Sequence, residues 1–291
     1  MHKFLRTIGF SDIRKRDLEM ITKDVIDHPD VLKVTKDSEG NEFAELSKEI
    51  APNMGITVRG TYQDDDRFQM EYYYPFFIGT GVSTQEQIDV EKHSEKESYA
   101  GVCDELRLGV TLIFYLQNVA DYLAEKNGKL SMNNMHGAVL AGLSCEGKIL
   151  FPIEKVENKD SKSSSHKSGE RNQLIAEARE GNEDAIESLT LEDMDMYSIL
   201  SKRIAHEDIL TIVNSYFMPY GIESDQYSIL AEIIDYSLEK NSLTGEEIYC
   251  MKVDCNDLVF DICINKKDLM GKPAVGRRFK GNIWMQGSVC L

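Results

Sequence analysis

The sequence predicts an α+β fold built in two parts. Runs of β-branched and aromatic residues alternate with turn sequences before residue 157, and a second group of such runs begins at residue 208. The stretch between 157 and 172 is rich in Ser, Lys and Gly, as linkers and exposed loops are. The chain has 291 residues, more than one hydrophobic core usually serves. We therefore expect an α+β domain at 1–156, a linker or exposed loop at 157–172, and a helical segment plus antiparallel β domain at 173–291.

The first part opens with a predicted helix from Ser11, a suitable N-cap, to about His28, where Pro29 prevents continuation. Its apolar face consists of Ile13, Leu18, Ile21 and Val25. Four β-rich runs at hairpin spacing follow and predict an antiparallel meander. They occupy 31–36, 42–47, 55–62 and 68–77, and 88–93 is a candidate further strand.

The longest apolar run, Gly109–Ala120, predicts a helix from near Asp104 to Asn127 that packs across this sheet, with Gly128 as its stop. The run is shorter than the roughly 20 apolar residues that cross a bilayer, so we expect no membrane partner. A hairpin over 138–153, turning at Cys145–Gly147, would complete the first part.

The second part predicts short helices followed by an antiparallel β-barrel or sandwich. The first helix stops at Gly181, Asn182 caps the second, and Thr190 begins the third. From Asp208 onward, β-branched and aromatic runs predict four or five antiparallel strands, closed by GRRFKGNIWMQG at 276–287.

Charge and cysteine content restrict the class of protein. The formal net charge is −17, which disfavours general binding to nucleic acid or anionic lipid. From Asn265 onward the chain nevertheless carries +5, against −22 for the remainder. Six cysteines without a C-x-x-C motif are typical of buried thiols in a reducing compartment, and no secretory signal precedes them. We expect a cytoplasmic protein.

The basic stretch near the end supplies the candidate ligand-binding residues, which are Arg277, Arg278, Lys280 and Trp284. On one interpretation, glycines bend a strand pair, aromatic side chains fill a barrel and the arginines point to water. On the other, an arginine binds a phosphate or carboxylate while an aromatic side chain stacks on a ring. The P-loop pattern fails, because arginines replace the required Lys and Ser/Thr, and no motif predicts a cofactor.

Catalytic and metal sites have little support in the residue patterns. Cys103 with His93 is a conceivable nucleophilic pair, but the neighbouring acids would raise the thiol pKa. Asp64, Asp65 and Asp66 form a triple Asp between two strands, where we expect a solvated turn. The six histidines show no metal-ligand spacing, so no metal is expected.

Several long blocks, in order, resemble an uncharacterised family of Gram-positive bacterial proteins catalogued only as a domain of unknown function. The blocks are NMGITVRG, EYYYPFF, EKESYAGVCDE, GVTLIFYLQNVADYL, EDMDMYSILSKRI, INKKDLMGKPAVG and GRRFKGNIWMQG. The resemblance implies a bacterial cytoplasmic protein of about this length and supplies no activity, ligand or site residue.

These observations favour a non-enzymatic binding or regulatory protein with a basic C-terminal contact surface. Its partner would be a small anionic ligand or a protein. Alternatively, the basic stretch contacts the acidic N-terminal part of its own chain or of a dimer partner. An enzyme of unrecognised type using residues 93–104 is the rival class, and single-stranded nucleic acid binding is a minor one.

Overall fold

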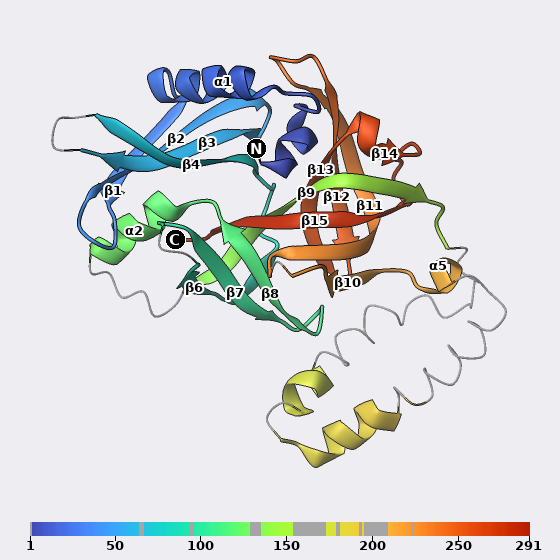
Figure 1. Cartoon of the computed structure of the whole chain (residues 1–291). Coiled ribbons are helices and arrows are strands. Elements are labelled where there is room, and N and C mark those ends of the chain that lie inside the picture. Colours follow the sequence, from blue (N-terminus) through green and yellow to red (C-terminus); the bar gives the residue numbers. More distant parts are fainter. Residues whose placement is uncertain are drawn as a thin grey trace.

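A computed structural model describes residues 2–63, 67–93, 96–128, 135–153, 173–178, 181–191, 194, 209–222 and 224–291. Within these ranges the chain forms an antiparallel sheet and a larger mixed sheet with a few short helices (Figure 1), which confirms the α+β class. The predicted linker at 157–172 and the triple Asp at 64–66 lie outside the described residues. No described helix has the length and apolar character needed to span a membrane.

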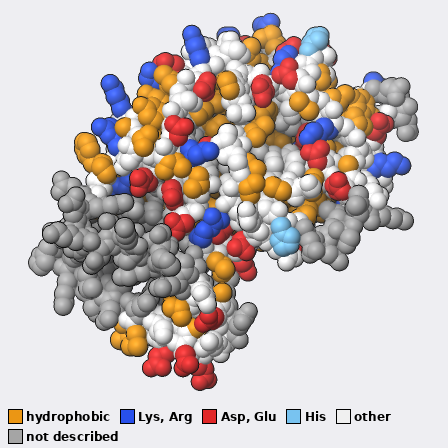
Figure 2. All heavy atoms as spheres, turned by 180° about the vertical axis from the view of Figure 1, so that it is seen from behind, with side chains coloured by type: hydrophobic (Ala, Val, Ile, Leu, Met, Phe, Trp, Pro, Cys, Tyr) orange, Lys and Arg blue, Asp and Glu red, His pale blue; other side chains and the backbone are white. Residues whose placement is uncertain are grey.

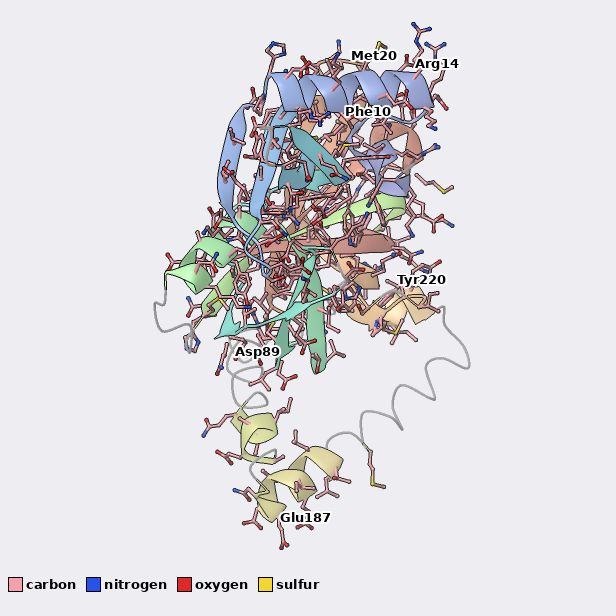
Figure 3. All side chains as sticks on the ribbon, turned by 60° about the vertical axis from the view of Figure 1, so that its left-hand side comes forward. Phe10, Arg14, Met20, Asp89, Glu187 and Tyr220 are labelled. Atoms are coloured by element: carbon pink, nitrogen blue, oxygen red, sulfur yellow. The ribbon has the colours of Figure 1, made fainter. Side chains whose placement is uncertain are left out.

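The smaller sheet is the predicted meander. Its four strands are β1 (Val31–Lys36), β2 (Glu42–Ala51), β3 (Met54–Tyr62) and β4 (Phe68–Phe77), in that order and all antiparallel. Helix α1 (Lys15–Asp27) covers one face, as Figure 1 shows. Figure 3 shows Arg14 and Met20 projecting away from the sheet, with Phe10 beneath the helix. The helix begins after Arg14, and the predicted cap Ser11 instead donates its hydroxyl to Glu246.

The larger sheet contains strands from both ends of the chain. Its main path is β10 (Tyr216–Pro219), β11 (Gln226–Lys240), β12 (Glu247–Cys255), β13 (Leu258–Asn265), β9 (His136–Leu150), β15 (Arg278–Val289), β8 (Val110–Leu116), β7 (Tyr99–Glu105) and β6 (Asp89–Lys92). Two short strands, β5 (Thr84–Gln87) and β14 (Leu269–Met270), also pair with β9. An additional pairing of β11 with β15 closes five strands, β11, β12, β13, β9 and β15, into a ring.

The interior of this ring is apolar. Alternate residues of its strands point inward and are fully buried, including Ile229, Val253, Ile262, Phe279 and Met285. The 3₁₀-helix η1 (Lys3–Ile8) contacts β9 and β13 from outside the ring, and η2 (Lys266–Asp268) follows β13. The ring therefore differs from the predicted C-terminal antiparallel barrel, because β9 comes from the first half of the chain and pairs with β13 in parallel.

The predicted helix from Asp104 to Asn127 is wrong over most of its length. The chain forms strands β7 and β8 there, turning at Gly109, and only α2 (Val119–Asn127) is helical. Leu112, Phe114 and Leu116 are buried while the residues between them are not, which is the two-residue period of a strand.

Two smaller expectations also fail. Residues 138–153 form no hairpin, because β9 is one strand whose irregularity at Cys145 is a bulge. Thr190 lies within a helix rather than at its start, donating its hydroxyl to the carbonyl of Ile186. The stretch after Asp208 begins with the short helix α5 (Ile209–Ile212) before β10.

The described helical residues 173–178 and 183–191 project from the sheets (Figure 3, Glu187). The predicted cap Asn182 is confirmed, since its side-chain oxygen accepts from the backbone N–H groups of Asp184 and Ala185. From behind, Figure 2 shows acidic side chains gathered at the tip of these helices, while charged and apolar groups are mixed over the sheets.

Candidate functional site

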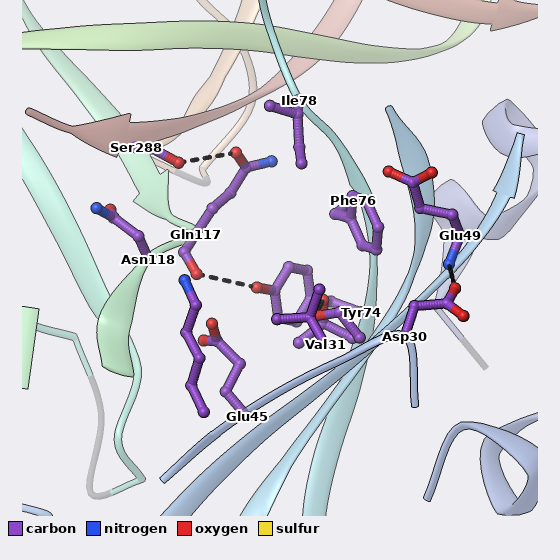
Figure 4. Close-up of a pocket in the computed structure, with 13 residues that line it drawn as sticks. Asp30, Val31, Glu45, Glu49, Tyr74, Phe76, Ile78, Gln117, Asn118 and Ser288 are labelled. Carbon is purple, nitrogen blue, oxygen red and sulfur yellow. Dashed lines mark hydrogen bonds between the residues drawn. The ribbon is translucent and has the colours of Figure 1, made fainter. Parts of the chain in front are cut away.

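A cavity of about 210 Å³ lies between the two sheets, and we call it the interlayer cavity. One wall is the face of the small sheet that α1 leaves uncovered, and the other is the junction of β8 with α2 together with the end of β15 (Figure 4). Its lining residues are Asp30, Val31, Lys33, Glu45, Ser47, Glu49, Thr57, Tyr74, Phe76, Ile78, Gln117, Asn118 and Ser288.

Beside the cavity, Arg59 on β3 connects the two sheets. Its guanidinium is completely buried and donates to the Glu45 carboxylate at 2.7 Å. It also donates to three tyrosine hydroxyls at 2.9–3.1 Å, those of Tyr72, Tyr74 and Tyr115. The carbonyl oxygens of Leu116 and Gln117 complete the set, so groups of both sheets converge on one cation. These further hydrogen bonds of the guanidinium offset part of the cost of burying the ion pair.

Glu45 presents the most unusual polar group in the lining. Its side chain is 7% exposed, and Arg59 contacts only one of its two carboxylate oxygens. No other described residue donates to the second oxygen, and Glu45 lines the interlayer cavity. Burial raises the pKa of Glu45 above its usual value, and the charge of Arg59 opposes that shift. The second oxygen is therefore a hydrogen-bond acceptor open to whatever enters the cavity.

The opposite wall is held by side-chain amides. Gln117 donates to the carbonyl of Phe77 at 2.9 Å and to the side-chain oxygen of Gln286 at 2.7 Å. Its own side-chain oxygen accepts from Ser288, and the Tyr74 hydroxyl donates to its backbone carbonyl, as Figure 4 shows. The wall is thus fixed to both sheets, which gives the cavity a preformed shape.

The mouth of the cavity is acidic. Asp30 and Glu49 are exposed, and the Asp30 carboxylate accepts from the backbone N–H of Glu49 at 2.8 Å. No ion pair joins either carboxylate to a cation of the described residues. The ammonium of Lys33, the one lysine among the described lining residues, is paired with Asp121 at 2.7 Å. The lining as a whole therefore favours positive charge.

The lining combines carboxylates, amides and hydroxyls with apolar side chains. Its described lining contains no Cys or His, and its apolar walls come from Val31, Phe76 and Ile78. No set of three or more His, Cys, Asp or Glu side chains placed to hold a metal occurs among the residues that the structure describes. A ligand that matches the lining would offer a hydrogen-bond donor and an apolar body.

The predicted ligand-binding residues lie in three different environments. Arg278 is buried, and its guanidinium donates to the carbonyls of Phe151, Val213 and Leu210 at 2.8–3.0 Å. Burial lowers its pKa, with no carboxylate of the described residues opposing the shift. Arg278 therefore joins the end of β9 to the segment around α5.

Trp284 is buried as well. Its indole N–H donates to Asp225 at 2.7 Å, and its ring stacks on Phe4 with ring centroids 5.1 Å apart. Lys280 is half-buried on β15, opposite Leu230 and Lys148. Trp284 thus lies at the contact with Phe4 and Asp225, whereas Lys280, two residues from Arg278 on β15, points to the same face of the strand as Arg278.

Arg277 borders a second cavity, of about 480 Å³, together with Arg278, Glu232 and Phe151. Its guanidinium lies 5.4 Å from the ring centroid of Phe151, which is 76% exposed, and it donates to the carbonyl of Lys272 at 2.9 Å. Arg277 and Lys280 are both half-buried, unlike the buried Arg278 and Trp284.

Part of the basic tail is neutralised within the chain. Lys266 pairs with Glu247 at 2.7 Å, and Lys267 pairs with Glu246 at 2.5 Å, at the start of the neighbouring strand. Arg6 forms an ion pair with the one acid of the tail, Asp268. Ion pairs with adjacent segments thus neutralise part of the excess positive charge that the tail carries from Asn265 onward.

The Cys103 and His93 pair is not assembled. Cys103 is 3% exposed in the core, and burial, followed by the charge of Glu105, raises its thiol pKa to about 12. His93 is exposed directly after β6, opposite Ser98, which lies five residues or roughly 17 Å along the strand from Cys103. The two groups are too far apart for direct proton transfer.

Sequence inspection missed Glu45 and Arg59. Both are charged residues inside runs of apolar and β-branched residues that were expected to be adjacent strands. A charge in such a run is costly to bury alone, so two opposite charges on neighbouring strands are a signal for a buried pair.

Residues 5–287 match the model of a family described as a domain of unknown function from an E. rectale gene. No curated protein and no solved structure matches the chain.

Proposed function

The chain belongs to the DUF3881 family, whose description assigns no activity, and we propose that it is a non-enzymatic binding protein that holds a small ligand in the interlayer cavity. The observation that carries this proposal is the second carboxylate oxygen of Glu45, an acceptor without a described donor beside a preformed cavity. A ligand that donates to this oxygen forms a hydrogen bond with an ionisable acceptor, and such bonds are stronger when the carboxylate is charged.

The position of the cavity also supports a regulatory role. Its walls belong to different sheets, so a bound molecule contacts both at once. A ligand that touches both sheets stabilises their packing against each other. The fraction of molecules with the two sheets packed then depends on the ligand concentration, which is what a regulatory protein needs. We further propose a cytoplasmic bacterial protein, supported by six cysteines that are all free thiols.

The test is a matched pair of tryptophan substitutions on β1. Val31 lines the cavity and is 49% exposed, whereas the next residue, Leu32, is 50% exposed and points to the opposite face of the sheet. Val31→Trp places a large side chain at the cavity mouth, and Leu32→Trp is the control. Small amines, alcohols, amides and carboxylates would be screened by the thermal unfolding midpoint and confirmed by calorimetric titration.

We expect at least one compound to raise the midpoint of the wild type and of Leu32→Trp but not of Val31→Trp. A ligand at 100 times its dissociation constant adds about 2.7 kcal/mol of stability. If every compound that binds the wild type binds Val31→Trp with equal affinity, the interlayer cavity is not the site.

A second candidate is the anion site expected at Arg277. The observation in its favour is the guanidinium stacked on the exposed Phe151 ring at the edge of the 480 Å³ cavity. Arginine stacked in this way can bind a phosphate or carboxylate with its remaining donors. The same screen separates the two sites, because an anion bound here is lost in Arg277→Gln and retained in Val31→Trp.

A further inference from the structure

We infer that the ligand of the interlayer cavity is a small organic amine, with its ammonium group at Glu45 and its apolar body against Val31, Phe76 and Ile78. The inference rests on the proposed function, because it names the chemical class of the molecule that the same cavity binds. Three features of the cavity carry it: the acceptor at its inner end, the charge of its mouth and the character of its walls.

The inner end offers a charged acceptor and no free donor. The open oxygen of Glu45 belongs to a carboxylate whose other oxygen accepts from Arg59 at 2.7 Å, and the side chain lines the cavity. Hydrogen bonds between an ammonium and a carboxylate are roughly twice as strong as those between neutral groups. Arg59 itself is completely buried and donates to Glu45, to three tyrosine hydroxyls and to two backbone carbonyls, so its guanidinium offers no hydrogen bond to a ligand.

The mouth of the cavity also favours a positively charged ligand. Asp30 and Glu49 flank the opening with no ion pair to a described cation, while Lys33 is neutralised by Asp121. Two carboxylates at the entrance raise the local concentration of cations and lower that of anions. A ligand bearing a carboxylate would have to pass the carboxylates of Asp30 and Glu49 and would then lie beside the carboxylate of Glu45.

The walls restrict the size of the molecule. Val31, Phe76 and Ile78 are apolar and face the cavity, and the space of about 210 Å³ is below the usual range for drug-sized ligands. A single ring or a short alkyl chain bearing one ammonium group matches this volume, whereas a nucleotide does not.

The experiment compares three probes of one shape: benzylamine, benzyl alcohol and benzoate. Calorimetric titration at pH 7 and low salt gives the affinity of each for the full chain. We expect benzylamine to bind at least tenfold more tightly than the other two and to lose its affinity in Val31→Trp but not in Leu32→Trp.

A charge test uses the mouth rather than Glu45, because Glu45→Gln leaves Arg59 buried without a countercharge and endangers the fold. Asp30→Asn combined with Glu49→Gln removes two exposed charges and keeps a side-chain acceptor at residue 30. The matched control, Glu19→Gln with Asp27→Asn, removes two exposed charges from α1 on the other face of the sheet. Benzylamine affinity should fall severalfold in the first variant only, and 0.5 M salt should reduce that difference.

The outcomes separate the inference from the proposed function. If benzyl alcohol binds as tightly as benzylamine and Val31→Trp blocks both, the amine assignment is wrong and the cavity remains the binding site. Equal loss of affinity in the mouth variant and its α1 control also overturns the amine assignment. If none of the probes binds at millimolar concentration, or Val31→Trp leaves benzylamine affinity unchanged, the proposed function fails as well.

Discussion

Arg59 is the side chain on which the joint between the two sheets depends. It is fully buried, pairs with Glu45 and donates to groups on β4, on β8 and at the β8–α2 junction. Arg59→Met preserves much of the side-chain volume but leaves Glu45 buried without a countercharge. We expect it to destabilise the protein by about 3–5 kcal/mol, measured as a shift of the urea unfolding midpoint.

The control for Arg59 is Arg14→Met, which breaks an exposed ion pair with Asp17 at the start of α1. Exposed pairs of this kind contribute little, so its midpoint should equal that of the wild type. Equal shifts for the two variants would show that the Arg59 network does not hold the sheets together.

His2 gives a pH-dependent contact that one fluorophore can report. Its ring lies 4.9 Å from Trp284, the only tryptophan in the chain, and burial lowers its pKa to about 4. The unfolded pKa is near 6.5, so the unfolded state binds more protons between these values. The stability from docked, neutral His2 is therefore complete above pH 6.5 and is lost as the pH falls toward 4.

We expect Trp284 emission to change with a midpoint near pH 4, as His2 becomes protonated and leaves the ring. Asp225 is a carboxylate that accepts from the indole N–H and therefore also contacts the fluorophore. His2→Phe keeps Asp225, so any change that persists in this variant belongs to the carboxylate. An identical titration in both proteins would rule out His2 as its source.

At the scale of elements, the strands of the meander could be predicted but one bulge between them could not. The turn between β2 and β3 was recognisable, and regular pairing outward from Ala51 and Met54 would set Glu45 opposite Gly60. An extra residue, Ile50, shifts the register so that Glu45 faces Arg59. A one-residue shift exchanges the two faces of a strand, so the buried pair was beyond prediction from pattern alone.

The helix predicted over the apolar run at β8 was wrong for a different reason. Residues 110–116 contain β-branched and aromatic side chains that suit either a buried strand or a buried helix, and periodicity does not separate the two over a short run. The pairing with β7 and β15 decided the outcome, since those strands offer hydrogen-bonding partners that the sequence does not reveal.

The glycines of β15 were correctly associated with aromatic packing, and Gly281 allows a direct test. A Cβ at this position would lie 2.6 Å from the ring of Phe279 and 2.7 Å from the carbonyl oxygen of Glu146. Gly281→Ala should therefore destabilise the protein by about 1–3 kcal/mol in urea unfolding. Gly128→Ala, where the nearest atoms are 3.4 Å away, should leave the midpoint unchanged; similar losses at both positions would refute close packing as the cause.

At the scale of the whole molecule, the larger sheet combines strands of both halves of the chain. β9 stands between β13 and β15, and β8 pairs with β15. Parallel pairings between segments more than a hundred residues apart leave no local pattern, so the ring could not be predicted, and its strand β9 was expected to be a hairpin. The cavity lies where this sheet meets the meander, and its existence was equally hidden.

The contacts of Arg278 indicate that the chain between β9 and β10 can be removed without unfolding the sheets. The carbonyls of Phe151, Leu210 and Val213 all lie within 3.0 Å of its guanidinium, so the chain leaves β9 and returns to β10 at one point. Among the described residues between these ends, Ala185 is the only buried hydrophobic one. We expect a variant with residues 154–208 replaced by a short Gly/Ser linker to fold and to keep the unfolding midpoint of the full chain, because the ends already meet and little of the described core is lost.

Arg278→Met in the full chain is the companion measurement for this deletion. It leaves three carbonyls without their donor and should lower the urea midpoint, whereas Arg277→Met, which loses one exposed contact, should not. If the shortened protein aggregates or unfolds while Arg278→Met is neutral, the fold depends on residues 154–208 and not on the closure at Arg278. If the shortened protein also retains benzylamine binding, the ligand site belongs to the two sheets alone.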